Sequence, residues 1–146
     1  MAAMSNYLEN KLTDQIFRGQ AYSFPSTLHF ALFTVAPTDA GGGTEVTGGS
    51  YARAAINATL ANFSGTQGAG TTTASSGSTG ITSNNVAITF PAPTANWGTV
   101  VALGIFDASS GGNMLFHGLL TAQKTINNGD AAPSFTPGIF SHSMDS

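Results

Sequence analysis

A glycine-rich stretch at residues 41–49 is the segment with the strongest likeness to a ready-made ligand site. It has the sequence GGGTEVTGG and leads into the alternating segment Tyr-Ala-Arg. A phosphate-gripping loop of the P-loop type needs a Lys-Ser or Lys-Thr pair at its end and a helix behind it. The stretch contains no lysine and runs into a predicted strand, so we expect no nucleotide site. We predict that the glycines permit sharp bends, and that Glu45 and Arg53 form a local ion pair or meet a neighbouring molecule.

The histidines are candidates for metal binding and for catalysis. His29, His117 and His142 are isolated in the sequence, so a zinc site would have to be assembled wholly by the fold. Ser141 and Asp145 lie beside His142, but hydrolase triads bring their members from separate rigid elements and require an oxyanion hole. We therefore expect no metal site, no catalytic residues and no enzymatic activity.

Two further features have the residue types of a binding site. The segment DASSGGN at residues 107–113 offers oxygen ligands, but it lacks the repeated acids and final glutamate of a strong calcium loop, so we interpret it as a hairpin loop. Trp97 could stack on a sugar ring, although a lone tryptophan beside a strand is more often a core or interface anchor. The acids elsewhere are scattered and give no paired-carboxylate signature of glycoside cleavage. We expect no bound cofactor.

Charged residues are scarce in this chain. They make up 8% of its 146 residues, with a net charge of −3, where about 25% is typical. So few bases cannot neutralise several phosphates, and we expect no nucleic-acid binding. The sequence has no run of about 18 apolar residues and no basic start followed by an apolar stretch. We therefore expect that the protein is made in a cytoplasm and does not contact a membrane. A surface of Gly, Ser, Thr and Asn does not repel copies of itself.

One amphipathic helix is predicted near the N-terminus, over residues 6–18. We place its N-cap at Asn6 and its end at Gly19. A helix of this length is marginal by itself, so its apolar stripe must dock on something. The stripe consists of Leu8, Leu12, Ile16 and Phe17.

The rest of the chain is predicted to form short strands separated by turn signals. The Asn128-Gly129 pair favours a type I′ turn. Six or seven strands without alternating helices indicate a mainly β fold, an antiparallel, jelly-roll-like β-sandwich, with a small barrel as the nearest alternative. The predicted strands are residues 27–35, 51–60, 86–90, 99–106, 114–120, 121–126 and a segment from Phe135 onward.

A long polar loop is predicted at residues 61–85. Only Phe63 and Ile81 are large side chains in it, and this composition predicts a flexible loop. Since ordering the loop costs more backbone entropy than two buried side chains return, we infer that a neighbouring molecule holds it in place. The chain is expected to form one domain, divided into an N-terminal helix, a β-sandwich and a polar tail at residues 1–20, 21–140 and 141–146.

Four blocks of the sequence stand out together. They are NYLENKLTDQIFRGQAY, LHFALFTVAPTDAGGGTEVTGGSYARAAI, SNNVAITFPAPTANWGTV and LGIFDASSGGNMLFHGLLTAQKTINNGDAAPSF. From about Ser5 to Phe135 they resemble a family of short virion structural proteins of tailed bacteriophages and prophages, whose members are usually labelled tail-fibre proteins. The resemblance implies a non-enzymatic piece of the virus particle, with no catalytic residues to carry over. The end of the chain, TPGIFSHSMDS, departs from the strand-like ending expected for it.

Two virion roles fit this reading of the sequence. Host-binding fibres are long and repetitive, whereas this chain has no internal repeat and no heptads. A capsid decoration or cement protein needs a compact β domain, a low-charge surface and extended arms. We therefore favour a capsid-surface cement protein that bridges neighbouring capsid subunits, with a tail or tail-fibre component as the alternative and a carbohydrate-binding module as a lesser one.

The expected partners are the major capsid protein or other virion proteins, and we expect a homo-oligomer in the particle. Contacts are expected on the helix stripe, on the 41–49 loop, on the 61–85 loop and on the tail. The predicted interface residues are Leu8, Leu12, Ile16, Phe17, Glu45, Tyr51, Arg53, Phe63, Ile81 and Trp97.

Overall fold

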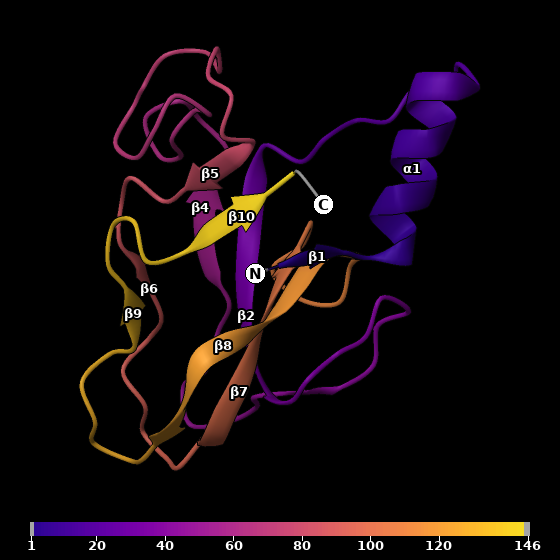
Figure 1. Cartoon of the computed structure of the whole chain (residues 1–146). Coiled ribbons are helices and arrows are strands. Elements are labelled where there is room, and N and C mark those ends of the chain that lie inside the picture. The colour runs from indigo at the N-terminus through magenta and orange to yellow at the C-terminus, as the bar shows by residue number, and fades with distance from the viewer. Residues whose placement is uncertain (1, 145–146) are drawn as a thin grey trace.

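The computed structural model describes residues 2–144 as one helix and ten strands (Figure 1). The elements are β1 (Ala3–Met4), α1 (Asn6–Phe17), β2 (Thr27–Val35), β3 (Thr44–Glu45), β4 (Ala54–Asn57), β5 (Ile81–Ser83), β6 (Ile88–Thr89), β7 (Gly98–Phe106), β8 (Met114–Ile126), β9 (Ser134–Phe135) and β10 (Ser141–Ser143).

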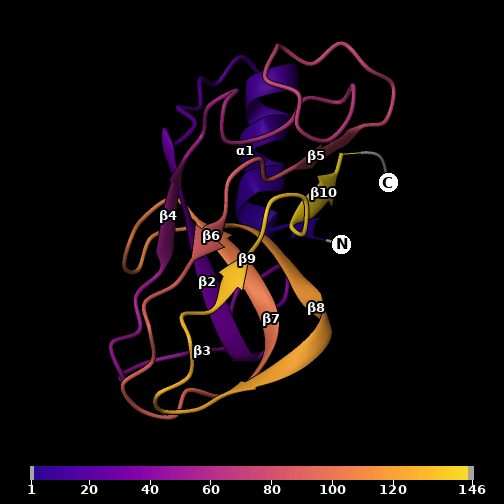
Figure 2. The same ribbon diagram turned by 90° about the vertical axis from the view of Figure 1, so that its left-hand side faces the viewer.

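The main sheet has six strands in the order β1-β8-β7-β2-β3, and β4 pairs with the other half of the β2 edge that β3 occupies. All of its pairings are antiparallel. Two short ribbons, β5–β10 and β6–β9, form a second layer, and Figure 2 shows β6 and β9 in front of the main sheet. The prediction of an antiparallel β-sandwich with one N-terminal helix is confirmed; the jelly-roll likeness stays a prediction.

The core fills the space between the two layers. Phe30 and Leu32 of β2 point into it at every second position, which is the period of two that the sequence of this strand predicts. Val100, Leu103 and Ile105 of β7 also point into it, with a bulge between Val100 and Ala102 interrupting the alternation. The opposite face of β2 is also covered, by a smaller cluster around Phe33 and Ala102. The largest members of the main cluster are Phe30, Leu32, Ile88, Phe90, Trp97, Val100, Leu103, Ile105, Ile126 and Phe140.

The strand predictions were correct in place but not always in length. Residues 114–120 and 121–126 belong to the one strand β8, because four residues, 120–123, bulge opposite the single residue Val101 of β7. The predicted strand 51–60 is shorter, since its first residues are drawn into a side-chain network described below. Strands β1, β3, β5 and β10 were not predicted; each has only two or three residues, too few for a pattern.

The first half of the predicted polar tail at residues 141–146 is a strand. Residues 141–143 form β10, which pairs with β5 across the register Ser141↔Ser83 to Ser143↔Ile81. His142 is buried between these strands and the ring of Phe116. Residues 141–143 are Ser, His and Ser, so no apolar alternation indicates this strand. Asp145 lies outside the described residues.

Helix α1 begins at Asn6, the first residue of the predicted range, but its N-cap is one residue earlier than predicted. Its N-cap is Ser5, whose Oγ accepts from the N–H of Leu8 and donates to the carbonyl of Met114, so the cap also ties the helix to β8. Gly19, at φ 66°, ends the helix as predicted. Only Leu8 is buried, and Ile16 and Phe17 are exposed. The apolar stripe therefore docks on its own subunit at one end only.

The loop at residues 61–85 has a network of internal hydrogen bonds, which its composition does not indicate. Its hydroxyl and amide groups bond to its own backbone: Thr79 donates to the carbonyl of Thr66, Gln67 donates to that of Ala74, and Asn85 donates to that of Thr71. These bonds stand in for the missing apolar core. Contact with a neighbouring molecule stays a prediction. Residues 54–106, which include the loop, contain no Asp, Glu, Lys, Arg or His.

The Asn-Gly turn forms, but not as type I′. Asp130 donates its N–H to the carbonyl of Asn127, and Gly129 has φ 84°. Among the described residues Ser50 is the one non-glycine with positive φ, so Asn128 lacks the angle that type I′ requires. The turn does not close a hairpin either, because β9 pairs with β6.

Candidate functional site

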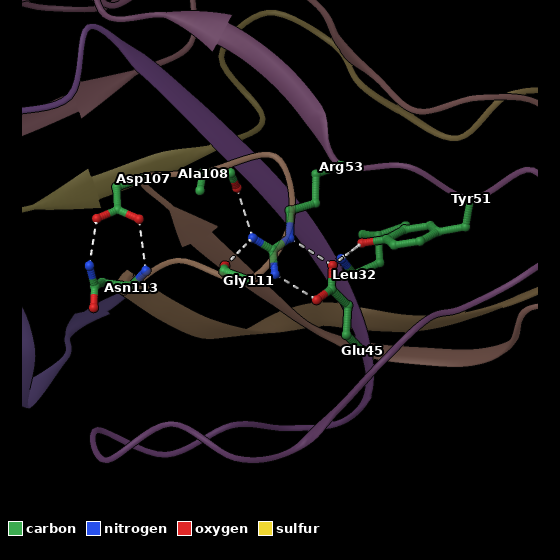
Figure 3. A network of polar contacts seen from close by, with 8 residues as sticks. All are labelled: Leu32, Glu45, Tyr51, Arg53, Asp107, Ala108, Gly111 and Asn113. Atoms are coloured by element: carbon green, nitrogen blue, oxygen red, sulfur yellow. Dashed lines mark hydrogen bonds and ion pairs between the residues drawn. The ribbon is translucent and has the colours of Figure 1, made fainter.

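Arg53 lies at the centre of a polar network that joins four segments of the chain (Figure 3). Its Nε and Nη2 donate to the two carboxylate oxygens of Glu45, each over 2.8 Å. Its Nη1 donates to the carbonyls of Ala108 and Gly111, at 2.8 and 2.9 Å. The guanidinium carbon lies 3.7 Å from the ring centre of Phe106. Only 6% of the Arg53 side chain is exposed, so the guanidinium of this bidentate pair is shielded from water.

Tyr51 extends the network to the main sheet. Its hydroxyl donates to Glu45 Oε1 at 2.9 Å and accepts the N–H of Leu32 at 2.9 Å. Burial raises the pKa of Tyr51 above its ordinary value, and the adjacent Glu45 adds to this, so the phenol stays neutral. Of the two alternatives predicted for Glu45 and Arg53, the local ion pair is present in the subunit. Through Glu45 and Leu32, the Tyr51 hydroxyl links the glycine-rich 41–49 loop to β2.

The segment at residues 107–113 is a hairpin loop between β7 and β8. Both carboxylate oxygens of Asp107 accept from Asn113, one from its N–H at 2.7 Å and one from its side-chain amide at 2.8 Å. The carboxylate closes the loop, as the hairpin interpretation implies. Among residues 2–144 no group of three or more His, Cys, Asp or Glu side chains is placed to hold a metal ion.

A groove of about 460 Å³ lies beside this network and the first turn of α1. The acidic groups along it are already engaged: Glu45 by Arg53, and Asp39 by His117, whose Nε2 lies 2.8 Å from Asp39 Oδ1. The glycines of the 41–49 loop bend the backbone around one end of the groove. The bend is tight at Gly43, where a Cβ atom would lie 2.6 Å from the carbonyl oxygen of Val35. The charged side chains along the groove are therefore already paired, which is typical of a structural framework.

His142 is a buried titratable group. Its ring lies 4.5 Å from that of Phe116, and neither ring nitrogen makes a hydrogen bond of good geometry. Burial lowers the pKa of His142 below 6.5, and outweighs the backbone of Ala2, which favours the protonated ring.

This shift predicts that acid weakens the attachment of β10. The unfolded chain binds a proton at His142 more readily than the folded chain, so the stabilisation is complete above about pH 6.5 and is lost as the pH falls through the lowered pKa. We expect wild type to lose more unfolding free energy between pH 7.5 and 5.0 than His142→Phe, measured by urea denaturation. An equal loss in both proteins would contradict the prediction.

The predicted interface residues fall into three groups. Leu8 and Trp97 are buried in the core, where they leave almost no side-chain surface for a partner; the Trp97 indole N–H donates to the carbonyl of Gly49. This burial also removes Trp97 as a sugar-stacking platform. The members of the internal network, Glu45, Tyr51 and Arg53, are described above.

The third group retains some accessible surface. Phe63 and Leu12 are partly buried, and Phe63 stacks on Phe30. Ile16, Phe17 and Ile81 are exposed apolar side chains. Of all the predicted interface residues, these three are the ones most open to a partner.

Asn84 is a central residue that sequence reasoning missed. Its side-chain amide donates to three backbone carbonyls, those of Val86, Phe135 and Thr136, and its Oδ1 accepts the N–H of Phe140. It is almost wholly buried. Its hydrogen bonds join the end of the long loop to the C-terminal segment. Nothing in the polar run that contains it distinguishes it from its neighbours.

The chain matches a family model over residues 3–142, nearly its whole length, and the family is described as "Podophage GP4 fiber I protein gp80". The chain belongs to this Gp80 family. Membership confirms the resemblance to fibre-labelled structural proteins of tailed phages, and makes the chain a phage virion structural protein. No curated protein gives a significant match. Within residues 2–144, no helix is long and apolar enough to cross a bilayer.

Proposed function

We propose that this member of the Gp80 family is a fibre component on the tail side of the virion, and that it acts by binding rather than by catalysis. The family description, which names a fibre protein, is the observation that carries the proposal. The self-bonded framework around Arg53 and the folded 61–85 loop support it, because a connecting module must keep its shape under load. The module would contribute through many identical weak contacts rather than one strong one.

A capsid cement role is the second candidate. The low charge of the chain and the absence of charged side chains over residues 54–106 favour it, since a neutral surface can lie across neighbouring capsid subunits without repulsion. A cement protein that binds only the assembled lattice would stabilise the shell by mass action.

The copy number and location of the chain in purified virions distinguish the two roles. We expect quantitative mass spectrometry to count on the order of a few to a few dozen copies per particle, as repeated tail modules require. Gold-labelled antibody against the chain should mark the tail in electron micrographs. Hundreds of copies, with label over the capsid, would overturn the fibre role and favour cement.

A further inference from the structure

An apolar arm projects from the main body of the subunit. It comprises residues 12–24, the second half of α1 and the segment after it. Ile16 and Phe17 lie in the last turn of α1, and Phe24 lies in the following segment, where its ring contacts Tyr22. The side chains of Ile16, Phe17 and Phe24 are all mostly exposed. Phe17 is 81% exposed. Figure 1 shows the helix standing apart from the sandwich, and its buried anchors are Ser5 and Leu8 at the start of α1. A short helix with an uncovered apolar stripe is marginal by itself.

An apolar groove of about 360 Å³ opens between β8 and the segment 133–141. On its rim, Leu119 is 69% exposed and Ile139 is also mostly exposed. Beyond the β1 pairing at Phe116 and His117, no other described strand pairs with the outer edge of β8. The groove therefore combines apolar walls with an open strand edge. Its deeper walls include Leu32, Val100, Leu103, Leu120, Phe135 and Phe140.

The arm and the groove lie on different sides of the subunit. Figures 1 and 2 place α1 on the side away from β6 and β9, and the cap of the helix is fixed to β8 through Ser5. A subunit with its helix held in this way cannot fill its own groove. Five of the nine large exposed apolar side chains among residues 2–144 lie at these two places: Ile16, Phe17, Phe24, Leu119 and Ile139.

We propose that the apolar arm of one copy docks in the apolar groove of a second copy, which makes a head-to-tail contact that repeats from subunit to subunit. Two different patches of the same chain then form one interface, so the contact generates a ring or a filament rather than a closed two-fold pair. The proposal deepens the structural role proposed above and rests on it for its place in the virion.

The charges at the two patches are compatible with this contact. Lys124 lines the groove. The last turn of α1 has no basic residue, and Arg18 beyond it is held by Asp14 at 2.8 Å. The negative end of the helix dipole can therefore face Lys124, and Asp14 offsets the charge of the neighbouring Arg18.

Paired substitutions test the contact on the full chain. The arm variant is Ile16→Ser with Phe17→Ser, and the groove variant is Leu119→Ser with Ile139→Ser. The control is Val35→Ser with Leu60→Ser, two exposed apolar residues outside both patches. All six side chains are largely exposed, so the variants should fold, which circular dichroism checks. Sedimentation velocity over a range of concentrations measures assembly.

We expect wild type and the control to assemble alike. The arm and groove variants should each associate at least about tenfold more weakly, because each loses two buried apolar side chains from the contact. Mixing the two variants is the decisive step. The intact arm of one chain fits the intact groove of the other, so the mixture should form a 1:1 complex that grows no further.

Three results would overturn the proposal. They are a wild type that stays monomeric at every concentration, a groove variant that assembles like wild type, which would indicate helix-to-helix pairing, and a mixture that forms no complex. None of these bears on where the chain lies in the virion. The location and copy-number experiment therefore fails or succeeds independently.

Discussion

Replacement of Arg53 by alanine will lower the free energy of unfolding by about 3 kcal/mol, near the lower end of the cost of breaking a buried ion pair. The change leaves the carboxylate of Glu45 without its positive partner and the carbonyls of Ala108 and Gly111 without their donor. Glu45 keeps some contact with water, with 24% of its side chain exposed, which holds the cost below the upper end of the range. Urea denaturation at pH 7 measures the effect.

The chain contains a matched control for this prediction. Arg18 pairs with Asp14 at the same 2.8 Å, but 70% of its side chain is exposed. Arg18→Ala should therefore cost no more than about 0.5 kcal/mol. Arg53→Lys should remain clearly destabilised, because an ammonium group cannot match both carboxylate oxygens and both carbonyls at once. Equal costs for Arg53→Ala and Arg18→Ala would show that burial does not strengthen the Arg53 network.

Replacement of Asn84 by alanine will destabilise the fold by about 3 to 5 kcal/mol. It removes the amide donor of three backbone carbonyls, of which that of Thr136 keeps the N–H of Ile139, and it leaves the N–H of Phe140 without its side-chain acceptor. Each group left unsatisfied in this buried site costs about 1 to 3 kcal/mol before relaxation. Because Asn84 fastens the C-terminal segment, amide hydrogen exchange should rise first in residues 135–143. The denaturation midpoint and the exchange map together check the prediction.

The isosteric change Asn84→Asp separates hydrogen bonding from packing. Its carboxylate keeps the acceptor for Phe140 but turns an oxygen toward carbonyl oxygens, so we expect at least the loss seen with alanine. Asn85→Ala is the neighbouring control: it removes bonds to Gly70 and Thr71 inside the loop, and its effect should stay in the loop. An Asn84→Asp variant as stable as wild type would refute the role assigned to the amide.

Periodicity in the sequence was enough to predict the long elements. Alternation in residues 27–35 located β2, the apolar segment 99–106 before a hairpin loop located β7, and the i, i+4 spacing from Leu8 located α1. The order of apolar and polar side chains along these segments is regular, and this regularity indicates the type of each element. The sandwich class followed from their order.

The missed features depend on contacts that are distant in sequence. Ser5 replaced Asn6 as the helix cap because β8 supplies a partner for its hydroxyl. Strand β10 exists because β5 lies beside it, not because serines favour strands. Asn84 meets Phe140, 56 residues away. A single sequence carries no local signal of such partners.

The candidate site was predictable in part for the same reason. The Glu45–Arg53 pair spans eight residues, and its opposite charges could be read directly. The carbonyls of Ala108 and Gly111, which complete the network, come from the distant β7–β8 loop. Backbone acceptors have no residue type, so no composition or spacing could have indicated them.

The absence of charged residues over residues 54–106 should make the conformation of this segment insensitive to salt. The long loop holds its shape through hydroxyl and amide hydrogen bonds, which dissolved ions screen far less than they screen paired charges. Its conformation should therefore be the same in fresh water, in brine and in the cytoplasm of a bursting cell. A partner that binds the long loop should meet the same loop conformation at every salt concentration.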